Sequence, residues 1–300
     1  MKKVFVIIVT YNAMQWIDKC LHCLSQSSIP VVPVLIDNYS TDGTREYIPT
    51  HYPDVVWLPQ EKNLGFGQGN NVGFKYAMQE KADFVVLLNQ DAYLEEHAIE
   101  NMLAAYDSDS VLSPLHLTGD GENLDKNFKY YLYRNKKINL LDDLLIRKKS
   151  NVKYKIQEVN AACWMMSVGV LQKIGGFNPI FFHYGEDENY TQRLKYHNIP
   201  FYIIPNAFMR HDREEHGNMQ VFNRNKVKRE ILRECCNINN NLGNIIIRLI
   251  ILQASYYISD LPRHQYRIGS FIMGLFWILG HISAIGTSRK VDRNLGPNWL

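Results

Sequence analysis

The fold of this chain is decided by the stretch Phe84-Val85-Val86-Leu87-Leu88-Asn89-Gln90-Asp91. Its five consecutive apolar residues predict a central strand covered on both faces, where alternation with polar residues is not required. Asp91 follows at the carboxyl end of this strand, where ligands bind in open α/β sheets. A carboxylate there can hold a divalent cation, which in turn can hold a diphosphate. The alternative is that Asp91 caps a helix formed by residues 92–96.

Upstream of this stretch, two further apolar runs end on polar residues, at Thr10-Tyr11-Asn12 and at Asp37-Asn38. Strands and helices alternate along this part of the chain, which predicts an α/β fold with a mostly parallel sheet flanked by helices. Residues 1–110 are therefore expected to form a nucleotide-binding half. The predicted order is a strand at 4–9, a helix at 14–24, strands at 31–36 and 55–58, a helix at 72–79 and the strand at 84–88.

The second part of the chain is less regular, and residues 115–156 are expected to form loops and helices over the site. Residues 111–222 would complete one domain with residues 1–110, and residues 223–300 would form a helical C-terminal extension. The predicted elements are a strand within 159–167, helices at 168–174 and 187–196, a strand at 200–204 and a charged helix at 225–234.

The composition argues against a nucleic-acid partner, because 33 basic residues nearly balance 30 acidic ones in 300 residues. Residues 126–155 nevertheless hold ten Lys and Arg residues against only Asp142 and Asp143. Such a run forms either a solvated face or a surface for an anionic lipid or a phosphorylated acceptor.

The five cysteines are an odd number in a chain without a secretory signal, which favours reduced thiols in a cytoplasmic protein. Cys20 and Cys23 match the C-x-x-C spacing inside a predicted helix. Because no second pair lies at zinc-finger spacing, the pattern favours neither a metal site nor a redox site there.

A second group of candidate residues is Glu186-Asp187, which follows the aromatic stretch at 181–184. These carboxylates suit the acid-rich first turn of a helix. They also suit a general base whose pKa is adjusted by an apolar, aromatic pocket. His211 ends another strand-like run, where it is either a structural histidine or the completion of a metal site begun by Asp91.

Taken in order, these motifs resemble family 2 glycosyltransferases of the GT-A fold. The resemblance is strongest to the rhamnosyltransferase-like branch, which builds bacterial surface polysaccharides. It covers about residues 4–216, and the ordered set is far more specific than any single motif. The matching segments are VIIVTYN (6–12), IDNYSTDGT (36–44), NLGFGQGNN (63–71), LNQD (88–91), KIGGF (173–177), FFHYGED (181–187) and the position of His211.

The resemblance implies a GT-A (Rossmann-like) fold and transfer of a sugar from a nucleoside-diphosphate sugar, either dTDP-rhamnose or a UDP-sugar. Asp187 would be the catalytic base with Glu186 beside it, and Asp91 and His211 would hold Mg²⁺ or Mn²⁺. The nucleotide-sugar contacts implied by the family pattern are Thr10, Tyr11, Asn12, Asp37, Asn38, Gly65, Asn70, Asn71, Asn89 and Asp91.

The expected chemistry is a single displacement that inverts the anomeric centre, since no Ser-His-Asp pattern points to a covalent nucleophile. Two positions depart from the broader family. Asn89 stands where the metal motif Asp-x-Asp often has its first carboxylate, although Asn is usual in the rhamnosyltransferase-like branch. Tyr39 stands where a glycine is frequent, which would alter the base pocket.

The C-terminal extension contains an apolar run that could contact or span a membrane. Residues 268–288 contain no Asp, Glu, Lys or Arg and are long enough to span a bilayer, but several glycines and His281 dilute the run. Packing or interfacial helices are therefore preferred to a span. A glycan acceptor carried on a polyprenyl diphosphate would explain both the apolar helices and the basic run. The expected location is the cytoplasmic side of the plasma membrane, with peripheral contact.

Two rival functions are open from the sequence. A sugar nucleotidyltransferase also uses an α/β sheet and a carboxylate-bound metal, but it would favour a glycine-rich phosphate loop with a basic residue after the first strand. Thr10-Tyr11-Asn12 offers no such residue. The other rival is a catalytically inactive sugar-binding subunit, which would tolerate loss of Asp187 and Asp91.

Overall fold

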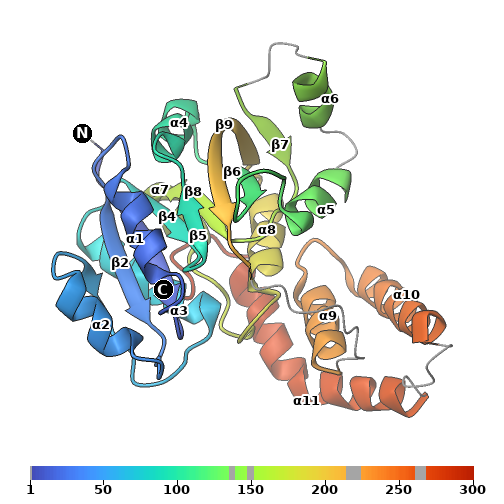
Figure 1. Cartoon of the computed structure of the whole chain (residues 1–300). Helices are drawn as coiled ribbons and strands as arrows, with labels where there is room; N and C mark the ends of the chain where they lie inside the picture. Colours follow the sequence, from blue (N-terminus) through green and yellow to red (C-terminus); the bar gives the residue numbers. More distant parts are fainter. Residues whose placement is uncertain (1, 135–138, 147–151, 214–223, 261–267) are drawn as a thin grey trace.

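The computed structural model describes residues 2–134, 139–146, 152–213, 224–260 and 268–300 (Figure 1). Parts of the basic run at 126–155 and the predicted domain boundary at 222 lie outside these residues. The strands are β1 (Val4–Thr10), β2 (Val32–Asp37), β3 (Val56–Trp57), β4 (Phe84–Leu88), β5 (Ala92–Leu94), β6 (Val111–Thr118), β7 (Tyr154–Ile156), β8 (Cys163–Ser167) and β9 (Phe201–His211). The helices are α1 (Ile17–Ser25), α2 (Thr44–His51), α3 (Phe66–Gln79), α4 (Ala98–Ala105), α5 (Lys126–Arg134), α6 (Leu140–Leu145), α7 (Val168–Ile174), α8 (Glu186–Tyr196), α9 (Arg224–Cys236), α10 (Leu242–Asp260) and α11 (Ile268–Asp292).

The strands form one mixed sheet in the order β3-β2-β1-β4-β8-β6-β9-β5, with β7 also paired to β9. The N-terminal half is parallel, because β1 pairs in parallel with β2 and β4, and β2 pairs in parallel with β3. The second half is mixed: β6 and β9 are parallel, whereas β8 is antiparallel to both β4 and β6. The α/β fold with its mostly parallel sheet is thus confirmed.

Strand β4 lies at the centre of the sheet and contributes to a hydrophobic core on each face. Val85 and Leu87 pack in one core together with Phe74 of α3, while Val86 and Leu88 pack in the opposite core. Successive side chains of a strand point to opposite faces. A strand covered on both sides therefore needs an unbroken apolar run, as the sequence of β4 has.

The residues after Asp91 form β5, an edge strand, so the alternative in which Asp91 caps a helix is wrong. Ala92 lies opposite His211 in the antiparallel pairing of β5 with β9. Strand β9 extends to His211 instead of ending near residue 204, which makes this pairing possible. The region 115–156 also differs from the prediction, since it contains part of β6 and the whole of β7 besides its helices.

The glycine-rich segment is mostly helix, and α3 begins at Phe66, six residues before the predicted start. Glycine is an unfavourable helix residue, but here it permits close packing of α3 on β1. A Cβ atom on Gly73 would lie 2.3 Å from Ile7, and one on Gly69 would lie 2.9 Å from Val9. The predicted strand within 159–167 also starts late, at Cys163.

Helices α9, α10 and α11 form a layer beside α8 (Figure 1). A third hydrophobic cluster joins this layer to the loop before α8, through Phe181, Ile231 and Ile285. Among the described residues, the helices all fall short of the length and apolar content needed to cross a membrane. The spanning alternative for residues 268–288 therefore has no support there.

The end of the chain returns to the α/β domain after α11. The backbone N–H of Gly176 donates to the carbonyl of Asn298 at 2.8 Å, and the side-chain amide of Asn71 donates to the carbonyl of Trp299 at 3.2 Å. The C-terminus consequently lies against the N-terminal half of the fold (Figure 1). The last residues of the extension are therefore part of the packing of the α/β domain.

Candidate functional site

A cavity of about 410 Å³ lies where the carboxyl end of β4, the end of β9 and the start of α8 meet. It brings together five of the residues predicted from the sequence: Asn89, Asp91, Glu186, Asp187 and His211. The other lining residues are Phe66, Asn127, Tyr131, Asn160, Ala161, Ala162, His183, Tyr184, Gly185, Glu188 and Arg213.

Asp91 and His211 are held side by side by the pairing of β5 with β9. The N–H of Asp212 donates to the carbonyl of Asp91 at 2.8 Å, and His211 Nε2 lies 3.3 Å from Asp91 Oδ1. The imidazole is 1% exposed and the carboxylate 22% exposed, so the cavity reaches the pair from the Asp91 side. Two groups that are 120 residues apart in the sequence thus share one edge of the sheet.

The donor atoms at this edge fit a divalent cation. A carboxylate oxygen and an imidazole nitrogen are suitable ligands for Mn²⁺ or Mg²⁺, and Asn89 Oδ1 is buried without a hydrogen-bond partner beside them. Asn89 Nδ2 is 3.5 Å from His211 Nε2, so the nitrogen of this amide lies next to the imidazole. The described residues contain no group of three or more His, Cys, Asp and Glu side chains placed for a metal. A cation here would therefore take its remaining ligands from substrate phosphates and water, as Mg²⁺ commonly does.

Glu186 and Asp187 open helix α8 directly after Gly185, whose φ of 95° requires the left-handed region. This turn points the first helical residues into the cavity. Glu186 is 4% exposed and its Oε2 has no hydrogen-bond partner. Asp187 is partly exposed and accepts a hydrogen bond from the N–H of Glu188 at 2.8 Å.

The pKa values of both carboxyl groups are raised. For Glu186 the main cause is burial, followed by the charge of Asp187. For Asp187 the main cause is again burial, followed by the charge of Glu188. Raising the pKa of a carboxylate makes it a stronger base, so this pair has the electrostatic setting of a general base.

On the other side of Asp91, the ends of β1 and β2 carry the predicted base and ribose contacts. Thr10 lies opposite Asp37 in the parallel register. The Asp37 carboxylate is fully buried, accepts from the N–H of Ser40 at 3.2 Å and lies 3.4 Å from the guanidinium of Arg45. Asp37 is thus fixed by its own neighbours at the end of β2.

The turn formed by Tyr11 and Asn12 is tied to the loop after β4. Gln90 accepts from the N–H of Tyr11 at 2.8 Å and donates to its carbonyl at 3.2 Å. Asn12 has φ of 52° and accepts from the N–H of Thr41 at 2.9 Å, which joins the turn to the loop after β2. Gln90 is a positioning residue that no sequence pattern indicated.

Four predicted nucleotide contacts have structural roles here. Asn38 accepts from the N–H of Leu64 at 2.7 Å and donates to the carbonyl of Gly65 at 3.2 Å. Gly65 has φ of 79°, and a Cβ atom on it would lie 1.9 Å from the carbonyl oxygen of Phe182. These contacts hold the start of α3 against the loop that precedes α8.

Asn70 and Asn71 also use their amides within the protein. Asn70 is 2% exposed and donates to the carbonyl of Phe66 at 3.0 Å. Asn71 accepts from the N–H of Phe177 at 2.7 Å and donates to its carbonyl at 2.8 Å. Both amides are thus buried and bonded within the protein, where they contribute to packing, and their contact with the nucleotide stays a prediction.

Two charged lining residues were not predicted from the sequence. Arg213 lies two positions after His211, and its Nε donates to Asp125 Oδ2 at 2.9 Å. Glu188 follows the Glu186-Asp187 pair and accepts from Arg233 of α9 at 2.8 and 3.0 Å. Their closeness to predicted residues was the only signal in the sequence.

Comparison with known proteins places this chain in a family. A family model described as "Glycosyl transferase family 2" matches residues 5–175. The chain is 28% identical over 199 residues to the "Low-salt glycan biosynthesis hexosyltransferase Agl10" of Haloferax volcanii, covering 65% of this chain and 62% of that protein. It therefore spans about three fifths of the length of that relative.

The chain is also 26% identical over 212 residues to the "N-acetylglucosaminyl-diphospho-decaprenol L-rhamnosyltransferase" of Mycobacterium tuberculosis, covering 63% of this chain and 69% of that protein. Among solved structures, residues 1–349 of S. aureus TarS in complex with UDP-GlcNAc superpose with a TM-score of 0.58 at 16% identity. That superposition covers 97% of this chain and 90% of TarS 1–349, so the folds are alike. On the strength of the family model, this chain belongs to glycosyl transferase family 2.

Proposed function

We propose that this glycosyltransferase inverts the sugar that it transfers, and that it acts in the assembly of a cell-surface polysaccharide. It takes the sugar, with rhamnose as the leading candidate, from a nucleoside-diphosphate donor and passes it to a hydroxyl of a glycan or lipid-linked glycan. The observation that carries the proposal is one cavity lined by Asp91 and His211 at one end of the site and by Asp187 at the start of α8. Diphosphate-binding groups and a base thus share one space.

Asp187 is the base in this proposal. Its carboxylate accepts the proton of the acceptor hydroxyl while the hydroxyl oxygen bonds to the anomeric carbon. The bond from that carbon to the diphosphate oxygen breaks, and attack from the opposite face inverts the configuration. A positioned base contributes about 10²–10⁴-fold to such a step. Glu186 supports this role by keeping a second carboxyl group beside Asp187, where it also contacts the acceptor.

Asp91 and His211 are the residues that would hold Mg²⁺ or Mn²⁺, with Asn89 beside them. The bound cation would stabilise the negative charge that develops on the leaving nucleoside diphosphate. Support comes from the paired carboxylate and imidazole and from the adjacent Asn89, whose Oδ1 is buried without a hydrogen-bond partner.

Thr10, Tyr11, Asn12 and Asp37 would bind the base and ribose at the ends of β1 and β2. The donor is dTDP-rhamnose or a UDP-sugar. The first is favoured by the likeness to a protein named as an L-rhamnosyltransferase. The second is favoured by the likeness in fold to a protein solved with UDP-GlcNAc.

The acceptor in this proposal is a glycan on a polyprenyl diphosphate, and the enzyme works at the cytoplasmic face of the plasma membrane. The name of the mycobacterial relative, which specifies a diphospho-decaprenol, supports this acceptor class. The cavity has cationic Arg213 in its wall, which suits a substrate that carries phosphate.

Thermal unfolding in the presence of nucleotide sugars tests the proposal. Binding to the folded state raises the melting temperature by mass action, so the true donor should raise it in a concentration-dependent manner. The assay compares dTDP-rhamnose, UDP-sugars, dTDP and UDP, each with and without Mn²⁺. Asp91→Asn should lose the part of the shift that depends on Mn²⁺, while the exposed control Glu95→Gln should retain it. If no nucleoside diphosphate shifts the intact protein under any metal condition, the proposed donor site is wrong.

A further inference from the structure

Helix α10 presents a stripe of large aliphatic side chains to solvent. Leu242, Ile246, Ile247, Ile250 and Ile251 are between 50% and 72% exposed. Leu242, Ile246 and Ile250 recur at every fourth position, so they lie on one side of the helix. Scattered exposed apolar residues are common, but five such residues within ten positions form a continuous patch that calls for a partner. We name these five residues the α10 stripe.

The opposite side of α10 is already packed. Ile245 is buried, and Leu249 and Leu252 pack against the cluster that α10 shares with α9 and α11. The helix is therefore apolar on two sides, of which the described part of the chain covers one. This is unlike an ordinary surface helix, which turns a polar side to water.

Helix α11 repeats the pattern. Phe276, Leu279 and Ile282 are between 61% and 68% exposed, while Trp277, Ile278 and Ile285 pack in the same cluster as α10. Its first 21 residues contain no Asp, Glu, Lys or Arg. Two neighbouring helices of the extension thus both leave an apolar side uncovered.

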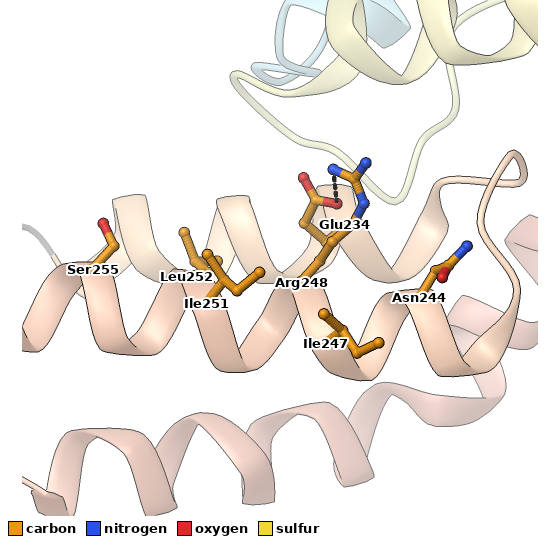
Figure 2. Close-up of a pocket in the computed structure, with 7 residues that line it drawn as sticks. All are labelled: Glu234, Asn244, Ile247, Arg248, Ile251, Leu252 and Ser255. Carbon is orange, nitrogen blue, oxygen red and sulfur yellow. Dashed lines mark ion pairs between the residues drawn. The ribbon is translucent and has the colours of Figure 1, made fainter.

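A cavity of about 590 Å³ between α9 and α10 adds a cationic group to this surface (Figure 2). Arg248 of α10 is 56% exposed, and its guanidinium lies 3.8 Å from Glu234 Oε2 of α9. Ile247 and Ile251 of the α10 stripe line the same cavity. A guanidinium in the middle of an aliphatic stripe matches a molecule that carries phosphate next to hydrocarbon.

We propose that the exposed sides of α10 and α11 form a docking surface for an anionic phospholipid bilayer, with Arg248 binding headgroup phosphate. Seven of the eight exposed apolar residues are Leu or Ile, the other being Phe276, and none is Tyr, Trp or Met. The cores of protein interfaces are instead enriched in aromatic residues, Met and Arg. The first 18 residues of α10 contain no acid, so the helix itself adds no negative charge to the surface, and Glu234 of α9 is paired with Arg248. Lys226 and Lys228 of α9 are also exposed and add positive charge nearby.

The surface is connected to the candidate active site through ion pairs. Arg248 pairs with Glu234, Glu234 pairs with Arg233 at 3.3 Å, and Arg233 pairs with Glu188 in the wall of the site cavity at 2.8 Å. Docking would therefore present the cavity at a fixed position relative to the bilayer. The inference rests on the proposed function in one respect: a lipid-linked acceptor would be reached at the bilayer surface.

Co-sedimentation of the full chain with vesicles tests the surface. We expect the protein to bind phosphatidylcholine vesicles more strongly when they contain phosphatidylglycerol, and to release as salt is raised. The double variant Ile246→Glu/Ile250→Glu should bind roughly tenfold or more weakly, because charges replace the aliphatic contact. Arg248→Gln should lose about fivefold on the anionic vesicles, the expected effect of one basic group at a membrane surface.

The control is Leu295→Glu, which introduces one such charge in place of a leucine that is 61% exposed but lies outside both helices. It should bind vesicles as the unaltered protein does. The proposal is overturned if the unaltered protein binds neither vesicle, or if the double variant binds as well as the control. It is also overturned if light scattering shows a dimer that the double variant dissociates, since a second copy would then cover the surface. The nucleotide-dependent rise in melting temperature, measured on the same proteins, reports separately on the proposed function.

Discussion

Arg193 of α8 and Asp292 at the end of α11 form an ion pair in the interior of the protein. Arg193 Nε lies 3.4 Å from Asp292 Oδ1, and the two side chains are 1% and 0% exposed. The same carboxylate accepts hydrogen bonds from Asn178 at 3.0 Å, Asn189 at 3.3 Å and Trp299 at 2.8 Å. The helix that begins with the proposed base is therefore anchored, near its other end, by the end of the extension.

Replacing Asp292 with Asn should destabilise the protein by about 3–5 kcal/mol, because it leaves the Arg193 charge buried without a counter-charge. Urea unfolding measures the loss. Glu95→Gln is the control, since Glu95 pairs with Arg210 at 3.5 Å where both side chains are over 40% exposed. That exposed pair should contribute at most about 1 kcal/mol. Equal effects of the two substitutions would contradict the role given to Asp292.

Asp187→Asn should lower the turnover number by about 10²–10⁴-fold, since the amide cannot accept the proton of the acceptor hydroxyl. The rise in melting temperature caused by the donor should persist, because the substitution leaves the donor contacts in place. Steady-state kinetics and thermal unfolding measure the two effects. A variant that retains full turnover would remove Asp187 from the reaction and favour a non-catalytic role for the carboxylate.

As the pH is lowered, the activity should be lost at a higher pH than it would be with an ordinary carboxylate as the base. Burial and the charge of Glu188 raise the pKa of Asp187, and a base is active only when it is deprotonated. The acidic limb of kcat/KM against pH therefore reports the raised pKa values of the Glu186-Asp187 pair. Arg233 partly neutralises Glu188, so Arg233→Met should move this limb to still higher pH.

Arg233→Lys is the matched control for that shift, because it retains the positive charge beside Glu188. Its profile should stay close to that of the unaltered protein. An acidic limb that does not move in Arg233→Met would show that α9 has no electrostatic effect on the base.

Glu186→Gln should stabilise the protein at neutral pH. The folded-state pKa of Glu186 is raised by burial and by Asp187, so the stability that this group contributes is present at low pH and is lost as pH rises through the folded pKa. The slope for one proton is at most about 1.4 kcal/mol per pH unit. Urea unfolding at mildly acidic and at neutral pH should show that the free energy of unfolding decreases less with rising pH in Glu186→Gln than in the unaltered protein. If the free energy of unfolding of Glu186→Gln decreases with pH as steeply as that of the control Glu95→Gln, the buried Glu186 carboxyl is not the cause of the decrease.

His211→Asn should raise the Mn²⁺ concentration needed for half-maximal activity by at least about tenfold, since the imidazole is one of two protein ligands in the proposed site. His97→Asn is the control, because His97 lies on the surface with its side chain 61% exposed. Metal titration of the activity gives the comparison, and the melting temperature without metal checks the fold. An unchanged requirement for Mn²⁺ would exclude His211 from the site.

Much of the fold could be predicted because it depends on patterns among residues that are close in the sequence. The unbroken apolar runs of β1 and β4 indicate strands covered on both faces. The polar residues after these runs indicate the carboxyl edge of the sheet, where ligands bind in open α/β folds. Asp91 and His211 stand at the ends of strand-like runs and Asp187 follows an aromatic stretch, and all three line one cavity.

Other features could not be predicted, because they depend on contacts between distant residues. Whether Asp91 is followed by a helix or a strand is decided by β9, whose His211 lies opposite Ala92. Asn71 looked like a ligand-binding amide within a glycine-rich segment, yet its partner Phe177 is 106 residues away. Nothing near Asp292 in the sequence indicates that its carboxylate meets Arg193.

The hydrogen bonds of Asn71 also bear on how the chain folds during synthesis. This residue, from the first quarter of the sequence, bonds to Trp299, which is 228 residues further along. Contacts of such long sequence separation form late, because the entropy of closing the intervening chain must be overcome first. Residues 1–110 therefore cannot complete their packing on the ribosome before Trp299 emerges. A nascent chain stalled before Trp299 should accordingly remain sensitive to protease around α3.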